Sequence, residues 1–184
     1  MELIYFFNET NGELFCSQKY EGENIPANAT LEEPPKTKDN ETVVFEDGGW
    51  VIKKDYRFTH KMLKIEANKY LIFDINELGE IPAGYELITN EQAEEKAKRN
   101  EINSLYMTKL DFYKFVLQPG GLDYATLTAE LEKNMELKAV WDLCKNIFRG
   151  DDFLNQYIKN YIPDITDEAL DAVFIEHGVS DLEK

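Results

Sequence analysis

Apolar and polar residues follow a strand-like pattern over the first half of the chain. Residues 3–7 form a short apolar run, and Asn11-Gly12 after it is a type I′ turn signal. Further hairpins are predicted over 42–53 and over 61–75, the latter turning at Ala67-Asn68, and NELGEIPAGYEL predicts a turn before a final short strand. The pattern therefore indicates a set of antiparallel hairpins.

The strongest hairpin signal is TVVFEDGGWVIK, which admits two turn positions. A turn at Asp47-Gly48 pairs Phe45 with Trp50 on one face and valine with valine on the other. A turn one residue later would set a glutamate and a lysine opposite valines. Because matched cross-strand pairs stabilise a sheet, we predict the turn at Asp47-Gly48.

The period changes at Thr89. Thr89-Asn90-Glu91-Gln92 has the spacing of a capping box, so a helix is expected to begin there. The segment that follows is charged almost all round, which favours a helix that connects two bodies over one laid against a partner.

Short helices are predicted over the remaining residues. The predicted segments are one capped by Thr108, one over 124–134, an apolar stripe from Leu137 to Phe148 ended by Gly150, one over 153–161, and a last helix capped by Thr166. The fold class predicted is α+β, with a β-rich domain over 1–88, a connecting helix over 89–106, and a small all-helical domain over 107–184.

A proline-rich, charged segment without apolar periodicity occupies residues 22–41. It contains Pro26, Pro34 and Pro35, and each proline fixes its own φ and moves the preceding residue toward the β region. The segment is therefore expected to be an extended connection that runs directly into the tryptophan-bearing hairpin.

The charge balance excludes two classes of partner. Lys and Arg number 20 against 36 Asp and Glu, a formal net charge of −16. Binding of nucleic acid through its phosphates and adsorption to an anionic membrane both need clustered positive charge, so neither is expected. The start lacks the features of a signal peptide, no apolar run is long enough to span a bilayer, and we expect a cytosolic protein.

Residues suited to catalysis or metal binding are sparse. Cys16 and Cys144 lie in apolar patterns and are expected to be reduced and buried. Neither His60 nor His177 has other metal-binding residues near it at the spacing of a metal site. Acidic pairs such as Asp151-Asp152 fit solvated surface or helix N-termini. We therefore predict no catalytic residues, no metal, no cofactor and no enzymatic activity.

A resemblance to a known family follows from motifs in the first half. Phage tail fibre assembly proteins (tail fibre chaperones) and related phage tail proteins have a string of the form IPANAT…PP…F.DG.W….D.RG, followed by a G-x-x-P-x-G-Y element. The first half of this chain, residues 1–90, resembles them, and Phe58 replaces the usual final glycine. The matching positions, and so the candidate partner-binding residues, are Pro26, Asn28, Pro34, Pro35, Phe45, Trp50, Asp55, Arg57 and Tyr85.

The resemblance implies a binding protein that helps a trimeric, β-rich fibre or receptor-binding protein to fold. It would act in the cytoplasm of the bacterial host, and retention in the virion tail is left open. The helical part is similar to small modules of phage and prophage tail-region proteins, and self-association through it is a further option.

Three alternatives stay open at this point. The chain could be a structural tail or baseplate adaptor, an acidic phage-encoded inhibitor that mimics nucleic acid, or a helical interaction domain with a β cap and no phage role. The formal charge of −16 fits the inhibitor, although lysines interrupt the acidic runs.

Overall fold

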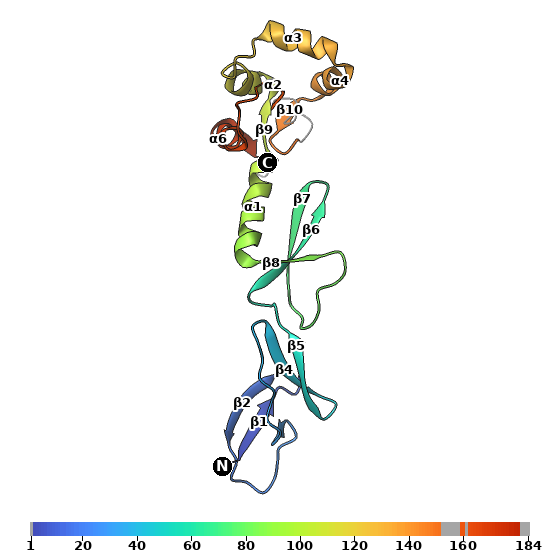
Figure 1. Ribbon diagram of the computed structural model, residues 1–184, viewed down its shortest axis with the longest axis vertical. Helices are drawn as coiled ribbons and strands as arrows, with labels where there is room; N and C mark the ends of the chain where they lie inside the picture. The colour runs from blue at the N-terminus through green and yellow to red at the C-terminus, as the bar shows by residue number, and fades with distance from the viewer. Residues whose placement is uncertain (1, 152–158, 161, 181–184) are drawn as a thin grey trace. The chain divides into compact units, whose positions relative to one another are not determined.

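Eight strands occupy the N-terminal part of the chain in the computed structural model, which describes residues 2–151, 159–160 and 162–180 (Figure 1). They form three antiparallel sheets, ordered β2-β1-β3, β4-β5 and β7-β6-β8. Their bounds are β1 Leu3–Phe7, β2 Leu14–Lys19, β3 Ala29–Thr30, β4 Glu41–Glu46, β5 Gly49–Lys54, β6 His60–Glu66, β7 Lys69–Asp74 and β8 Glu86–Thr89.

The chain divides into two compact units. The N-terminal unit comprises Met1–Glu66 and Leu71–Ala93, and the C-terminal unit comprises Ala67–Tyr70 and Glu94–Lys184. The tip of the β6–β7 hairpin therefore belongs with the helical half. Its Tyr70 backbone exchanges two hydrogen bonds with the Asn100 side chain, at 3.0 and 2.7 Å.

The predicted register of the β4–β5 hairpin is confirmed. Phe45 lies opposite Trp50 and Val44 opposite Val51, and the turn residues Asp47 and Gly48 both have positive φ. A two-residue turn with two positive φ values has the twist that antiparallel strands require.

The first turn differs from the two-residue turn expected at Asn11-Gly12. Of these two residues only Gly12 has positive φ, and the loop spans residues 8–13 between β1 and β2. Gly12 accepts a 2.8 Å hydrogen bond from Phe45 N, and a Cβ added to it would lie 2.5 Å from the Phe45 oxygen. The glycine is therefore required by a close approach to β4, which local turn chemistry does not encode.

The capping box at Thr89 is confirmed. Thr89 N donates to Gln92 Oε1 at 2.9 Å, and Gln92 N donates to Thr89 Oγ1 at 3.2 Å. Helix α1 spans Asn90–Ser104, close to the 89–106 expected, and ends where strand β9 begins.

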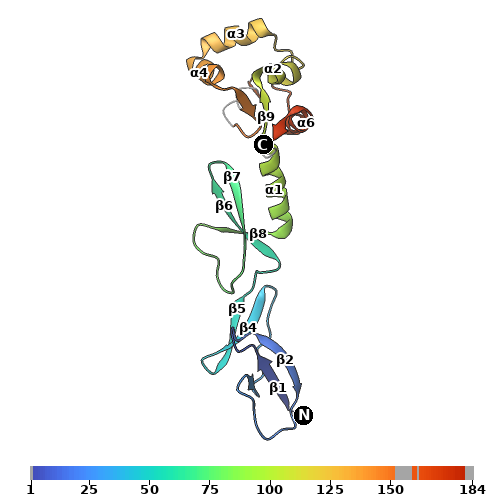
Figure 2. The ribbon, with the colours of Figure 1, turned by 180° about the vertical axis from the view of Figure 1, so that it is seen from behind.

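The C-terminal unit is not all-helical. Helices α2 Lys109–Phe112, α3 Tyr124–Lys133, α4 Met135–Leu143 and α6 Asp167–His177, with a π-helical turn over Tyr113–Leu117, surround strands β9 Leu105–Thr108, β10 Asn146–Phe148 and β11 Val179–Ser180. The strands form one antiparallel sheet, ordered β10-β9-β11. In Figure 1, and from behind in Figure 2, β9 and β10 lie between α6 and α4.

The strand β10 arises from the apolar stripe between Leu137 and Phe148, which was expected to be one helix. The helix stops at Leu143, and Ile147 and Phe148 pair with Met107 and Tyr106 of β9. A short apolar run fits a buried strand as well as a helix, so pairing across about 40 residues decided its conformation. Most of the helix expected over 153–161 lies outside the described residues.

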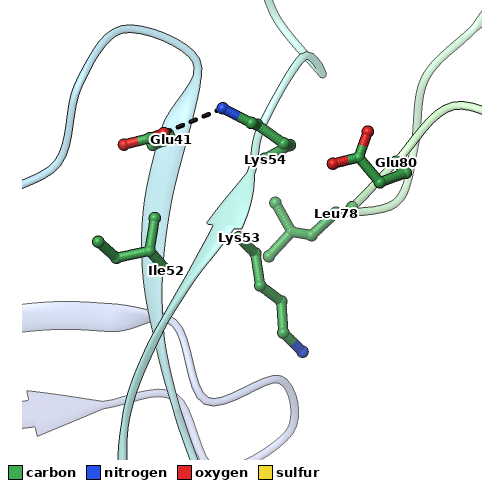
Figure 3. Close-up of a pocket in the computed structure, with 7 residues that line it drawn as sticks. Glu41, Ile52, Lys53, Lys54, Leu78 and Glu80 are labelled. Carbon is green, nitrogen blue, oxygen red and sulfur yellow. Dashed lines mark hydrogen bonds and ion pairs between the residues drawn. The ribbon is translucent and has the colours of Figure 1, made fainter.

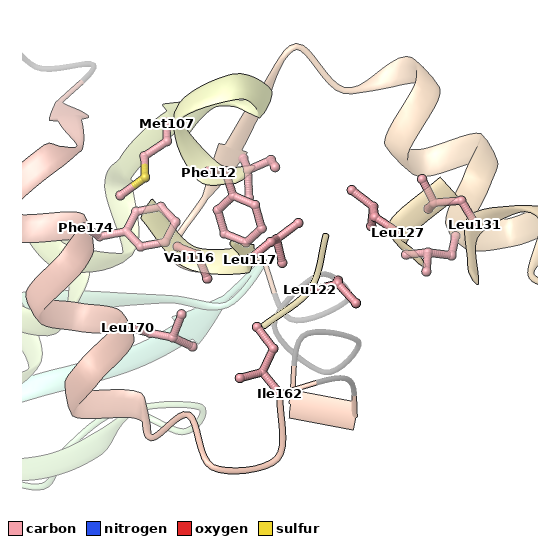
Figure 4. Packing of buried hydrophobic residues seen from close by; sticks show 12 residues of the cluster. Met107, Phe112, Val116, Leu117, Leu122, Leu127, Leu131, Ile162, Leu170 and Phe174 are labelled. Atoms are coloured by element: carbon pink, nitrogen blue, oxygen red, sulfur yellow. The ribbon is translucent and has the colours of Figure 1, made fainter. Parts of the chain in front are cut away.

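The core of the C-terminal unit gathers side chains from its helices and its sheet (Figure 4). Phe112 and Phe174 are each 1 % exposed, with ring centroids 6.1 Å apart, and Met107 and Leu170 pack in the same cluster. Thr108 and Thr166 cap α2 and α6 as predicted, each accepting a hydrogen bond from the backbone three residues later.

A charged network lies beside this core. Arg149, which is 2 % exposed, forms ion pairs with Asp167 at 3.0 Å and with Asp171 at 2.6 Å. Asp171 also pairs with Arg99 of α1 at 2.6 Å. A buried guanidinium requires such partners, because an uncompensated buried charge is strongly destabilising.

Candidate partner-binding site

The proline-rich segment is fastened to the N-terminal sheet at its IPANAT end. Ala29 N donates to the Pro26 oxygen at 3.1 Å, and Phe7 N donates to the Asn28 oxygen at 3.0 Å. Ala29 then pairs with Phe6 as part of β3. Pro26 and Asn28 therefore act through their backbone, by turning the chain and adding a short strand to β1.

The middle of the segment is held by the tryptophan. Trp50 Nε1 donates to the Glu32 oxygen at 2.8 Å. The Trp50 ring also packs edge-on against Phe45, with centroids 5.1 Å apart, and Phe45 stacks on Phe7 at 4.5 Å. Three half-buried aromatic rings from β1, β4 and β5 thus form the surface to which the extended segment is attached.

Asp55 and Arg57 form a second fastening at the end of the β4–β5 hairpin. Arg57 Nε and Nη2 donate to the two Asp55 oxygens, each at 2.8 Å, and Arg57 Nη1 donates to Glu13 Oε1 at 2.7 Å. The three side chains are only 17–24 % exposed. Planar, bidentate pairing of this kind fixes geometry as well as charge, so the triad ties the loop after β5 to the first turn.

These contacts shift the acid–base properties of the pair. Hydrogen bonds from the Arg57 side chain hold the pKa of Asp55 below its ordinary value. Hydrogen bonds to Asp55 and then to Glu13 raise the pKa of Arg57. Both shifts favour the charged forms, as expected for an ion pair that is folded into place.

The remaining candidates lie apart from this cluster. Tyr85 makes an edge-to-face contact with Phe73 of β7, with centroids 5.5 Å apart, and its backbone N donates to the Pro82 oxygen. Pro34 is half-buried and Pro35 is exposed. The structure therefore brings Asn28, Phe45 and Trp50 together around Phe7, and places Asp55 with Arg57.

The closest contacts of Trp50, Phe45, Asp55 and Arg57 are with other residues of the N-terminal unit. Sequence reasoning missed three of their partners, which are Phe7, Glu13 and the Glu32 carbonyl. Phe7 could have been found as the last residue of the apolar run 3–7, whereas nothing local marks Glu13 as the partner of a residue 44 positions later.

The outward-facing apolar side chains are different residues. Phe58 is 81 % exposed and Phe15 is 79 % exposed. Phe15 is the extra residue of a bulge, because Cys16 pairs with Phe6 and Leu14 with Phe7. A bulge re-aims the side chain it carries, which accounts for an aromatic ring in solvent on an edge strand.

A cavity of about 460 Å³ lies beside β5 (Figure 3). Its lining residues are Glu41, Ile52, Lys53, Lys54, Leu78, Gly79 and Glu80. Figure 3 shows the Leu78 side chain reaching toward β5 from the loop before β8, and the ion pair between Lys54 and Glu41, whose distance is 3.0 Å. Gly79 N donates to the Lys54 oxygen at 2.8 Å, which holds this loop against the strand.

The thiols and histidines form no reactive group. Cys16 is exposed on β2 and not buried as expected, because every residue of that edge strand is exposed; Cys144 is half-buried, and burial raises the pKa of its thiol. His60 begins β6, and His177 stacks on Phe115 with centroids 3.8 Å apart. Within residues 2–151, 159–160 and 162–180, no cluster of three or more His, Cys, Asp or Glu could hold a metal ion.

A helix that spans a membrane must be long and apolar. Among the helices that the structure describes, none combines the length and the apolar character needed to cross a bilayer.

Acid is expected to weaken the N-terminal unit through Asp55. Because the folded pKa of Asp55 is depressed, its contribution is fully present above its unfolded pKa of about 4 and is lost as the pH falls through the folded pKa. Urea unfolding of Trp141→Phe, in which Trp50 is the only tryptophan, should therefore show a loss of stability below about pH 4 that is smaller in Asp55→Asn. The exposed Asp39→Asn variant is the control, and an equal acid dependence in all three proteins would contradict the assignment.

Trp50→Phe tests the hydrogen bond to the proline-rich segment. The substitution keeps an aromatic ring against Phe45 but removes the N–H that Glu32 accepts, so it should cost about 1–2 kcal/mol. Urea unfolding followed by far-UV circular dichroism measures the change. Amide hydrogen exchange over residues 29–33 should accelerate in Trp50→Phe but not in Trp141→Phe, and unchanged exchange there would contradict the fastening role.

Comparison with known proteins returned no match among protein-family models, curated proteins or solved structures.

Proposed function

We propose that this chain is a phage or prophage tail-associated binding protein that acts as a tail fibre assembly chaperone. The observation that carries the proposal is the way the ordered motif folds. IPANAT, Phe45 and Trp50 meet around Phe7, and Asp55 with Arg57 fastens the next loop. Residues spread over the 33 positions from 25 to 57 thus form one unit, which gives a physical reason for their order and spacing.

The same contacts change the role of the candidate residues. Phe45, Trp50, Asp55 and Arg57 are occupied with one another and with the proline-rich segment, so they hold a surface in shape. The partner would contact side chains that this framework presents, among them Phe15 and Phe58. Exposed aromatic side chains beside polar rims are typical of binding hot spots.

Chaperoning fits the needs of the proposed partner. Long β-rich trimers fold slowly and expose unpaired strand edges and apolar surface during folding. An acidic protein that covers such surface until the trimer closes would suppress aggregation in the cytoplasm of the bacterial host. This activity requires binding and no catalytic chemistry.

Co-expression tests the proposal. The fibre protein of the same phage or prophage is produced with this chain, with an empty vector, and with the Arg57→Ala variant, and its soluble trimeric fraction is measured by size-exclusion chromatography. We expect a larger trimeric fraction with the native chain only. A fibre that is equally soluble and trimeric in all three would refute the chaperone role.

A further inference from the structure

Strand β5 has an open edge. It pairs with β4 on one side, and among the residues that the structure describes the sheet contains these two strands only. β4 is covered on its other side by the first turn, through the Phe45–Gly12 hydrogen bond and a bridge between Glu13 and Val44. Of the two strands, β5 is therefore the one that offers its backbone outward.

The hydrogen-bond phase of the hairpin identifies the outward groups. Pairs in an antiparallel ladder alternate between hydrogen-bonded and non-hydrogen-bonded, and members of the second kind direct their N–H and C=O groups away from the partner. Phe45, opposite Trp50, donates away from β5 to Gly12, and Lys54 accepts away from β4 from Gly79. Both bonds place the outward phase of β5 at Trp50, Ile52 and Lys54.

The outward backbone groups between the turn and Lys54 stay open. In the described part of the chain, the N–H and C=O groups of Trp50 and Ile52 make no backbone hydrogen bond beyond that edge. Ile52 and Val51 are also 43 % and 39 % exposed, so apolar side chains accompany the free backbone. An exposed edge of this kind is a template for pairing with another strand.

The cavity beside β5 continues this edge. Gly79 already contacts Lys54 as a third strand would, and Leu78 and Ile52 supply apolar walls. An extended chain laid along Trp50 and Ile52 would therefore end in a space that accepts a side chain. Strand addition of this type draws affinity from main-chain bonds and specificity from such side-chain pockets.

The charges around β5 and the cavity indicate which kind of segment would bind there. Lys53 and Lys54 are paired with Glu46 and Glu41, at 2.6 and 3.0 Å, while Glu80 adds a further carboxylate to the cavity wall. The N-terminal unit as a whole holds 8 Lys and Arg against 18 Asp and Glu. This excess disfavours a second copy of the same acidic unit and favours a partner segment that carries positive charge.

We propose that the outer edge of β5 and the adjoining cavity bind an extended, lysine- or arginine-flanked segment of the partner by strand addition. The inference rests on the proposed function for the existence of a β-rich partner, and on the open edge for where that partner binds. The segment pairs with Trp50 and Ile52, places an apolar side chain between Ile52 and Leu78, and sets a basic residue near Glu80.

The test uses the full chain and two labelled peptides. In both, valine and threonine alternate, and the terminal residues are lysines in one peptide and glutamates in the other. Fluorescence anisotropy should show at least about tenfold tighter binding of the lysine peptide. Amide hydrogen exchange measured by NMR should slow at Trp50 and Ile52 when that peptide is added.

Two variants separate the edge from the fold. Ile52→Pro removes an outward N–H without removing a β4–β5 bond, and it should weaken the lysine peptide at least about tenfold. Glu80→Lys leaves the backbone intact and should reduce the preference for the lysine peptide. It decides the question if Ile52→Pro proves unfolded by circular dichroism. The matched control is Val51→Thr, which alters the opposite face of the strand and should keep the affinity.

Several results would overturn the inference. They are equal affinity for the two peptides, absence of binding by both, slowed exchange at β2 in place of β5, and undiminished binding by a folded Ile52→Pro variant. The two proposals also fail separately. Peptide binding at β5 with no effect on fibre solubility removes only the chaperone role, and full fibre rescue by a folded Ile52→Pro variant removes only the strand-addition edge.

Discussion

Replacing Arg57 by alanine is expected to lower the free energy of unfolding of the N-terminal unit by about 2–4 kcal/mol. The guanidinium donates to both oxygens of Asp55 and both oxygens of Glu13, at 2.7–3.1 Å. Without it, two carboxylates that are mostly withdrawn from water face each other unpaired. Urea unfolding in the Trp141→Phe background, where Trp50 reports on this unit alone, measures the loss.

Two matched variants test whether the geometry or the charge matters. Arg57→Lys keeps the positive charge but not the planar fork, so it should recover only part of the stability. Lys54→Ala breaks the pair with Glu41, in which the lysine is 40 % exposed and Glu41 keeps a hydrogen bond from Lys38 N, so this variant should cost clearly less than Arg57→Ala. If Arg57→Ala costs no more than Lys54→Ala, the triad does not have the structural weight assigned to it.

The Asp171→Ala variant should destabilise the C-terminal unit by about 3–5 kcal/mol. Asp171 lies between Arg99 and Arg149, and contacts each at 2.6 Å. Because Arg149 is 2 % exposed, removal of this carboxylate leaves a buried guanidinium with less compensation than burial requires. Urea unfolding in the Trp50→Phe background reports this unit through Trp141.

The control lies on the same helix. Asp167 also pairs with Arg149, but its side chain is 53 % exposed, so Asp167→Ala should cost clearly less than Asp171→Ala. Equal losses for the two variants would show that burial of the network has no special effect. A loss confined to unfolding of the N-terminal unit would contradict the placement of the network.

Several motif residues stabilise the fold and are not exposed for binding. Trp50 is committed to Glu32 and to two aromatic rings, and Arg57 is committed to two carboxylates. These residues therefore hold the extended segment and the loop after β5 in place. In the proposals made above, a partner contacts the edge of β5 and the exposed aromatic side chains around this framework.

Short-range patterns predicted the local elements well. The β4–β5 register follows from matched side chains within ten residues, and the capping of α1, α2 and α6 follows from Thr89, Thr108 and Thr166. Each of these depends on interactions between residues a few positions apart, so the information lies inside the segment itself. The α+β fold class, with strands first and helices after, has the same origin.

Contacts between residues far apart in the sequence decided the remaining features of the fold. The sequence by itself determined the hairpins, the helix starts and the acidic balance of this protein. Only the folded structure turned the end of an apolar stripe into β10, exposed Cys16 on an edge strand, and joined Glu13 to Arg57 across 44 positions. The physical reason is that a short apolar run or a single charge is compatible with several conformations, and burial against a distant partner selects one of them.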